Sequence, residues 1–386
     1  MPGMNILIAP DKFKDALDAR GVAEALARGA RRARPDAAIT LCSLGDGGEG
    51  TGRLLAATLG AAQHAANVLD PHARLRIATW WQTPAPGNAY RAGIIEMAEA
   101  SGLWLLAPEQ RRALETTSFG TGQLLAAAAD TGCRKITLCV GGSATVDGGA
   151  GCLQGLGWRL LDARGDAITT PMSGGGLAHI ARLAPPAQRR MLDIEILCDV
   201  TNPLLGPDGA AAVFGPQKGA SPAQVRALEV GLQHWADVLA DFAQRDLREL
   251  PGAGAAGGLP FGLAAALEAR LVSGFETMAE CVRLREKIAA ADVILTGEGR
   301  LDSQTTGGKV VGGVARMCAA AGKPCAALVG ATTCEDADEL RSLARTLGLQ
   351  SIVVVTPTGT SLTEALARTA SNLEQTVADW LKNNAC

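Results

Sequence analysis

Carboxylates and glycines recur in short polar segments that directly follow apolar runs. Asp46 and Glu49 lie in Gly45-Asp46-Gly47-Gly48-Glu49-Gly50, which formally matches the G-x-G-x-x-G pattern of dinucleotide-binding turns. Two carboxylates beside a pyrophosphate would repel it unless a cation lay between them. The segment therefore favours phosphoryl transfer with Mg²⁺ over NAD binding, and it predicts Asp46 and Glu49 as metal ligands. A tight turn with no ligand is the alternative.

A second glycine-rich segment, residues 141–149, follows the β-prone run 136–140. It combines hydroxyl groups with small residues that allow a ligand to approach the backbone closely. Gly142, Ser143 and Thr145 are therefore predicted to cradle a phosphate of the nucleotide. The alternative is a turn in which Ser143 and Thr145 only cap the following helix.

Asp199 follows the apolar run 194–198 and is therefore expected at the end of a strand, where α/β enzymes place their chemistry. It is a candidate general base. Asn202 is predicted to orient the substrate or a metal ligand, although an Asx-turn before Pro203 would explain it equally. Lys218, in the constrained loop 214–220, adds a cation that can act on phosphate charge.

The segment 296–305 places three charged residues, Glu298, Arg300 and Asp302, within five positions after another β-prone run. Glu298 and Asp302 are predicted metal ligands, and Arg300 is predicted to bind the substrate. Further nucleotide contacts are expected from glycines in this segment and in the glycine-rich run 252–258, namely Gly297, Gly254 and Gly257. The run 252–258 would be flexible unless a ligand such as phosphate ordered it.

The composition of the chain argues against further classes of function. The chain has 386 residues and a net charge of −3, so no general positive field exists to attract nucleic acid or acidic lipid. We expect no signal peptide and no membrane segment. Ten cysteines without a C-x-x-C pair indicate reduced thiols in a cytoplasmic protein. Carboxylates, glycines and lysines at strand ends are the groups that phosphoryl transfer uses.

The elements that must position these residues have the pattern of an α/β protein. β-prone runs alternate with helical stretches near both chain ends, which predicts a parallel sheet. A long middle segment has strands and glycine-rich loops of its own. We therefore predict one α/β domain built from residues 1–66 and 290–386, with a second α/β domain, residues 67–289, inserted between them.

Six loop motifs occur in an order and spacing that resemble the bacterial type I glycerate kinases. They are Ala9-Pro10-Asp11-x-Phe13-Lys14, Asp46-Gly47-Gly48-Glu49-Gly50-Thr51, Gly142-Ser143-Ala144-Thr145, Asp199-Val200-x-Asn202-Pro203-Leu204, Phe214-Gly215-Pro216-Gln217-Lys218-Gly219-Ala220 and Thr296-Gly297-Glu298-Gly299-Arg300-x-Asp302-x-Gln304-Thr305.

The resemblance implies phosphorylation of D-glycerate by ATP with Mg²⁺, in most members at the 2-hydroxyl. It also implies a flavodoxin-like domain made from both chain ends, an inserted α/β domain, and an active site in the cleft between them. Asp199 and Lys218 are then the predicted catalytic residues. Lys14, in the first motif, joins Asp46, Asn202 and Arg300 as a predicted substrate-binding residue.

Two other functions remain open at this point. A non-catalytic sensor could bind a small hydroxy acid or nucleotide in the same cleft, but it need not keep both its cations and its carboxylates. An NAD-dependent 2-hydroxy acid dehydrogenase would account for the segment 45–50, but the sequence lacks a His-carboxylate pair for hydride transfer. The sequence does not fix the oligomeric state, so a homo-oligomer also stays open.

Overall fold

The computed structural model describes residues 4–84, 91–301, 310–334 and 336–384. The chain divides into two compact units. Unit 1 comprises Met1–Asp46 and Phe275–Cys386, and unit 2 comprises Gly47–Gly274. Compared with the expected inserted domain 67–289, unit 2 also includes residues 47–66 and leaves 275–289 to unit 1.

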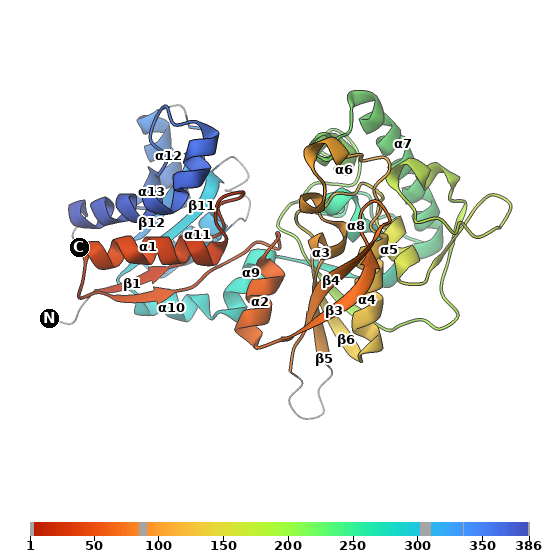
Figure 1. The fold of residues 1–386 in the computed structure, drawn as a ribbon, viewed down its shortest axis with the longest axis horizontal. Helices are drawn as coiled ribbons and strands as arrows, with labels where there is room; N and C mark the ends of the chain where they lie inside the picture. Colours follow the sequence, from red (N-terminus) through yellow and green to blue (C-terminus); the bar gives the residue numbers. More distant parts are fainter. Residues whose placement is uncertain (1–3, 85–90, 302–309, 335, 385–386) are drawn as a thin grey trace. The chain divides into compact units, whose positions relative to one another are not determined.

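Unit 1 is a parallel five-stranded sheet with helices from both ends of the chain (Figure 1). Its elements are β1 (Asn5–Ile8), α1 (Ala19–Ala33), β2 (Ala38–Leu41), α10 (Leu284–Ala290), β11 (Val293–Leu301), α11 (Val310–Ala320), β12 (Cys325–Thr332), α12 (Ala337–Leu347), β13 (Ser351–Val354) and α13 (Leu362–Asn383), with α9 (Gly274–Cys281) at its boundary.

The strand order of this sheet is β2-β1-β11-β12-β13, and every neighbouring pair is parallel. Counted along unit 1, these are its second, first, third, fourth and fifth strands. That order is the flavodoxin-like one, so the predicted fold class is confirmed for this unit. The direction of winding reverses between β1 and β11, and ligands of such sheets bind beyond the carboxyl ends of the strands at this point.

The first and last helices of unit 1 lie side by side (Figure 1). Asp18 begins α1 by accepting a hydrogen bond from the backbone N–H of Gly21, and Val22 and Leu26 bury their side chains. A Cβ at Gly29 would lie 2.1 Å from the carbonyl oxygen of Glu374 in α13. Glycine at this position therefore lets the two helix backbones approach closely.

Strand β11 is longer than the sequence pattern predicts. The apolar run ends near Thr296, yet β11 continues to Leu301 because β12 pairs with it as far as Thr332. Glu298 and Arg300 therefore lie on a strand rather than in the loop that the charged composition suggested.

Unit 2 contains a six-stranded mixed sheet, a two-stranded sheet and surrounding helices. Its strands are β3 (Ala62–Leu69), β4 (Leu75–Gln82), β5 (Arg91–Glu96), β6 (Cys133–Cys139), β7 (Arg159–Leu161), β8 (Arg182–Ala184), β9 (Asp193–Leu197) and β10 (Arg270–Val272). Its helices are α2 (Thr51–Leu59), α3 (Ala98–Ser101), α4 (Phe119–Asp130), α5 (Ala150–Gly155), α6 (Ala210–Phe214), α7 (Pro222–Ala243) and α8 (Leu259–Leu267).

The large sheet of unit 2 has the order β10-β9-β6-β5-β4-β3. Strands β5, β6, β9 and β10 are parallel, while β3 and β4 form an antiparallel pair at one edge. The core of this unit includes the buried rings of Trp80, Trp235 and Phe261. The carboxyl ends of β6 and β9 are followed by two of the segments that carry the predicted chemistry.

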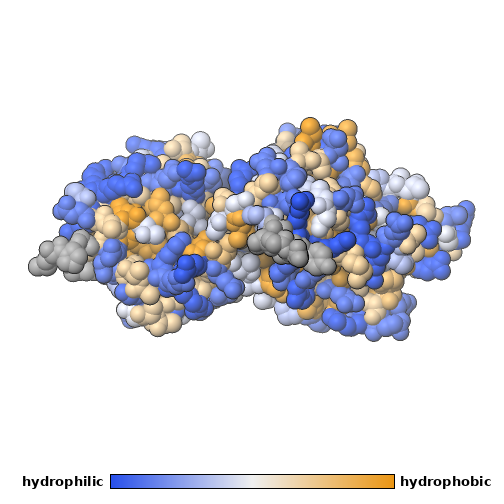
Figure 2. All heavy atoms as spheres, turned by 90° about the horizontal axis from the view of Figure 1, so that it is seen from below, coloured by the Kyte–Doolittle hydropathy of each residue, from blue (hydrophilic) through white to orange (hydrophobic). Residues whose placement is uncertain are grey.

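Polar and charged side chains predominate on the face shown in Figure 2, where apolar side chains form small groups. This distribution is ordinary for a protein in water. In the described parts of the chain, no helix combines the length and apolar character that a membrane crossing requires.

Candidate active site

Three carboxylates lie near the carboxyl ends of neighbouring strands in unit 1. Asp11 follows β1, Asp46 follows β2, and Glu298 lies in β11. Burial raises the pKa of Asp11 well above its ordinary value, and the negative charges of Asp46 and Glu298 raise it further. Each of these acids therefore adds to a negative potential that a bound cation would relieve.

Asp11 is a site residue that the sequence analysis did not assign. It directly follows an apolar strand, which is the same signal that singled out Asp199. It stands in the motif Ala9–Lys14, in which Lys14 is the predicted site residue.

Two predicted cationic residues of unit 1 are exposed. Lys14 follows Phe13 in the loop after β1 and lines a cavity of about 440 Å³. Arg300 lies near the end of β11, paired in register with Ala331 of β12. Asp302, the fourth predicted metal ligand, lies outside the described residues.

Gly297, predicted to contact a nucleotide, lies within β11. Its carbonyl oxygen accepts a hydrogen bond from the N–H of Asp11. A Cβ here would lie 2.2 Å from the carbonyl oxygen of Leu328, so sheet packing alone requires glycine. A contact between Gly297 and nucleotide stays a prediction.

In unit 2 the structure brings three predicted segments together. The N–H of Gly141 donates to the carbonyl of Gly47 over 3.2 Å. A Cβ at Gly142, which has a φ of 71°, would lie 3.2 Å from Oε2 of Glu49. A Cβ at Gly47 would lie 2.6 Å from the carbonyl of Leu197, the last residue of β9. The loops after β6 and β9 thus meet the loop that carries Glu49.

Glu96, at the end of β5, fixes the start of α2 and was not assigned from the sequence. Its Oε2 accepts from the N–H of Gly50 and its Oε1 from that of Arg53, each over 3.0 Å. A carboxylate at this place stabilises a helix N-terminus. Burial raises the pKa of Glu96, and the two backbone hydrogen bonds oppose that shift. The glycine at position 52 gives the carboxylate room, because a Cβ there would lie 2.6 Å from Cγ of Glu96.

Lys218 is buried and holds the loop 141–149. Its Nζ donates to Oγ of Ser143 over 2.8 Å and to the carbonyl of Thr145 over 2.7 Å. Desolvation lowers the pKa of Lys218 to about 7, and the charge of Asp147 opposes that shift. Lys218 is therefore not a solvated loop residue. Ser143 and Thr145 do not cap α5, whose N-cap is Gly149.

Asp147 stabilises the same loop from the inside. Its Oδ2 accepts from the N–H and the hydroxyl of Ser118, both over 2.7 Å, and its Oδ1 accepts from the N–H of Gly149. Burial raises the pKa of Asp147 against the effect of these bonds. Oγ1 of Thr145 is buried and has no hydrogen-bond partner among the described residues. The loop is thus built around one buried carboxylate and one buried amine.

Asp199 is half-buried, two residues after the end of β9. Its Oδ1 accepts from the hydroxyl of Ser273 over 2.6 Å and from the N–H of Gly274 over 3.1 Å. These two donors fix the orientation of the carboxylate. Asn202 is engaged within its own loop, because its Nδ2 donates to the carbonyl of Asp208 over 2.8 Å.

Gly254 and Gly257 are buried in the run 252–258. A Cβ at Gly254 would lie 2.0 Å from the carbonyl of Pro203, and one at Gly257 would lie 1.9 Å from that of Thr145. The run is ordered by protein contacts, since the N–H of Gly148 donates to the carbonyl of Gly257. Backbone packing explains both glycines, and their contact with nucleotide stays a prediction.

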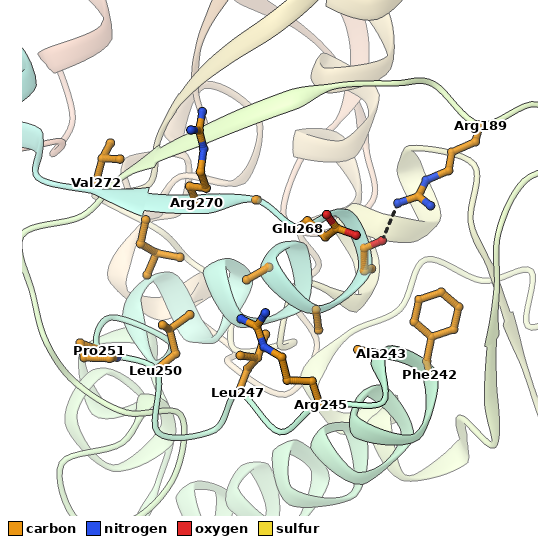
Figure 3. Close-up of a pocket in the computed structure, with 15 residues that line it drawn as sticks. Arg189, Phe242, Ala243, Arg245, Leu247, Leu250, Pro251, Glu268, Arg270 and Val272 are labelled. Carbon is orange, nitrogen blue, oxygen red and sulfur yellow. Dashed lines mark hydrogen bonds between the residues drawn. The ribbon is translucent and has the colours of Figure 1, made fainter.

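One cavity of unit 2 has a volume of about 890 Å³ (Figure 3). It is lined by α8, β10 and the segment 242–251. Arg189, labelled in Figure 3, also lines it, and its Nη2 donates to the carbonyl of Ala266 over 3.1 Å. Arg270, on its wall, is paired with Asp193 and Glu195. None of the predicted site residues lines this cavity.

Among the residues that the structure describes, no three His, Cys, Asp or Glu side chains are arranged to hold a metal ion by themselves. The predicted ligands fall into two groups, with Asp46 and Glu298 in unit 1 and Glu49 in unit 2. Mg²⁺ usually keeps several waters and shares its coordination with substrate phosphates, so it does not require such a cluster of side chains.

Comparisons with known proteins agree with this set of loops. The model of the glycerate kinase family matches residues 6–383. The glycerate 2-kinase of Escherichia coli K12 is 40% identical, over 98% of this chain and 100% of that protein. A glycerate kinase of Halalkalibacterium halodurans is 38% identical, over 98% of this chain and 99% of its own.

A solved structure from Salmonella typhimurium LT2, described as glycerate kinase 2, has a similar fold. It superposes with a TM-score of 0.79 at 38% sequence identity, covering 99% of this chain and 98% of that one. The matched residues cover both units. The chain therefore belongs to the glycerate kinase family.

Proposed function

We propose that this protein transfers the γ-phosphoryl group of ATP to the 2-hydroxyl of D-glycerate, giving 2-phosphoglycerate and ADP. The observation that carries the proposal is the full-length similarity to proteins named glycerate 2-kinase and glycerate kinase. The loops at the strand ends support it, because they hold the carboxylates, backbone N–H groups and cations that phosphoryl transfer needs.

We assign roles to the chain's own residues as follows. Asp199, held by Ser273 and Gly274, accepts the proton of the glycerate hydroxyl. Lys218 keeps the loop 141–149 in the shape that receives phosphate oxygens. Lys14 and Arg300 bind anionic groups of the substrates.

The carboxylates fit a divalent cation. Asp11 is buried beside two further acids, and Lys12 offsets the rise in its pKa only in part. Asp46, Glu49, Glu298 and Asp302 would hold Mg²⁺ together with the nucleotide. When bound, Mg²⁺ neutralises charge on the phosphate oxygens and orients them.

We also propose that the protein works in the cytoplasm. None of the nine cysteines that the structure describes forms a disulfide. Thiols of this number stay reduced most readily in a reducing compartment.

The direct test is an ADP-release assay with D-glycerate, L-glycerate and tartronate, followed by phosphorus NMR of the product. We expect turnover with D-glycerate and a 2-phosphoglycerate signal. A product that is only 3-phosphoglycerate would refute the regiochemistry. Absence of ADP above background with every acceptor would refute the kinase assignment, and binding without turnover would favour a sensor. Absorbance of NADH tests the dehydrogenase alternative.

A second prediction concerns the metal. Asp46→Asn should raise the Mg²⁺ concentration needed for half-maximal activity by about tenfold or more, because a metal ligand loses its charge. Activity is measured across a Mg²⁺ titration at saturating ATP. Asp36→Asn, which neutralises an exposed carboxylate in the same unit, is the matched control. If Asp46→Asn folds and its titration matches the wild type, Asp46 has only a structural role in its turn.

A further inference from the structure

We propose that the cavity of about 440 Å³ in unit 1 binds the adenine and ribose of ATP. The proposal rests on the kinase activity proposed above, and it adds the place where the nucleoside part of the phosphoryl donor is held. The cavity lies at the carboxyl ends of β11, β12 and β13, beside the first turns of α13. Open parallel sheets of this topology bind ligands at this edge.

The lining matches the chemistry of a nucleoside. It is mainly apolar, with Phe13 from the loop after β1, Val354 from β13, and Leu366 from α13. Hydroxyl groups interrupt this surface at Thr332 and Thr356. The volume lies within the usual range for small-molecule pockets, which are mostly apolar with a few polar groups that fix orientation.

The charge of the lining also favours a ligand with a phosphate chain. Among the described residues that line the cavity, Lys14 is the one with a charged side chain, and none is Asp or Glu. The acids of unit 1 described above, Asp11, Asp46 and Glu298, do not line it. A neutral base and ribose can therefore occupy the cavity without meeting a carboxylate of the described residues, and Lys14 offers a cation to the phosphates.

Two glycines shape the cavity by letting the loop after β1 pack onto the strand ends. A Cβ at Gly330 would lie 2.4 Å from the carbonyl of Gly299. A Cβ at Gly299 would lie 3.1 Å from Cα of Phe13 and 3.1 Å from the N of Lys14. Phe13 is thereby held at 3% exposure, and it forms a fixed wall.

Two features of the lining point to a bound group. Leu362, the first residue of α13, is 76% exposed on the cavity wall. A lone exposed leucine is ordinary, but at the wall of a preformed cavity it gives a base an apolar surface to cover. Thr356 is half-buried on the same wall and offers a hydroxyl that can bond to a ligand.

The test introduces a larger side chain into the cavity at a position in α13. Ala365 is half-buried on its wall, whereas Ala367 of the same helix is exposed and does not line it. Binding of ADP to the full chain is measured by isothermal titration calorimetry for the wild type, Ala365→Phe and the matched control Ala367→Phe. Inorganic tripolyphosphate, which has no nucleoside, is the second probe.

We expect Ala365→Phe to weaken ADP binding by about tenfold or more, since a phenyl ring would overlap the base. Tripolyphosphate binding should stay within about twofold of the wild type in both variants, and Ala367→Phe should bind ADP normally. Normal ADP binding by folded Ala365→Phe overturns the proposal. An equal loss of affinity for ADP and for tripolyphosphate also overturns it, because the substitution would then disturb phosphate binding rather than nucleoside binding.

Failure of the proposed function gives a different pattern. If the wild type binds ADP and Ala365→Phe does not, while no acceptor yields ADP in the turnover assay, the nucleoside site stands and the kinase assignment fails. If the wild type binds no ADP, both proposals fail.

Should Ala365→Phe not fold, Leu362→Asn replaces it, because the exposed side chain of Leu362 contributes little to the core. We then expect ADP binding to weaken by roughly threefold or more. An unchanged affinity in Leu362→Asn overturns the proposal.

Discussion

Replacing Asp199 with asparagine should lower kcat by about 10²- to 10⁴-fold, with a modest change in KM for glycerate. The variant is informative because the surrounding donors fix how the new amide sits. The N–H of Gly274 and the hydroxyl of Ser273 point at Oδ1 of Asp199. Asparagine keeps an oxygen there and puts a non-basic NH₂ in place of the other carboxylate oxygen.

Steady-state kinetics with D-glycerate, at several Mg²⁺ concentrations, separate the two roles open to Asp199. A lost general base is not restored by excess metal, whereas a lost metal ligand is restored in part. Ser273→Ala is the companion variant, since it removes one positioning bond and leaves the carboxylate. We expect it to lose activity less severely than Asp199→Asn. If folded Asp199→Asn keeps kcat within a few-fold, the base is another residue, with Glu298 or Asp302 next to be tested.

The second large effect concerns Lys218 and the pH dependence of stability. Its pKa is lowered to about 7 in the folded protein by burial, while the unfolded chain has an ordinary lysine with a pKa near 10.5. Between these values the unfolded state binds more protons than the folded state. The free energy of unfolding therefore rises with pH through this window, by roughly 1.4 kcal/mol per pH unit from this group. Below pH 7 both states are protonated and the contribution is constant.

Lys218→Met removes this slope. The quantity to compare is the unfolding free energy of the wild type minus that of the variant at each pH. Buried thiols such as Cys152, whose pKa is raised, make the unfolding free energy fall with pH, and this contribution is common to both proteins and cancels in the difference. Urea unfolding is measured from pH 6 to 10 by tryptophan fluorescence. Five of the six tryptophans lie in unit 2 with Lys218, so the signal reports mainly on that unit.

Lys382→Met, which removes an exposed positive charge from α13, is the control for net charge. We expect the difference in unfolding free energy to grow with pH for Lys218→Met only. A difference that stays constant from pH 7 to 10 would show that Lys218 keeps its proton in the fold. Lys218→Met should also lose kinase activity, because Ser143 and the carbonyl of Thr145 lose their shared donor.

The sequence predicts the strand-end acids well and the residues that support them poorly. Asp199 could be found because a polar residue after an apolar run marks the end of a strand. Asp11 gives the same signal, although it is not among the predicted site residues. Glu96 could not be assigned, because its task depends on where the start of α2 lies after folding. Loop lysines are usually solvated, so the burial of Lys218 also depends on tertiary structure.

The roles of glycines are also hard to predict from the sequence, because they depend on tertiary contacts. Gly254 and Gly257 match a phosphate-binding pattern, but the backbone of Pro203 and Thr145 explains them. Their partners lie about 50 and 110 residues away in the chain, so no local pattern reveals the constraint. The extension of β11 to Leu301 likewise follows from its pairing with β12 rather than from its own residues.

Unit 1 also sets the order in which the protein can fold during its synthesis. Strand β1 pairs with β2 and β11, and the central strand β11 begins only at Val293. At ribosomal rates of roughly 5–20 residues per second, β1 and β2 wait on the order of 10–50 s for that partner. Residues of unit 2 are complete earlier and can fold meanwhile. The apolar strand Asn5–Ile8 is therefore a nascent segment on which chaperones can act while unit 2 is being synthesised.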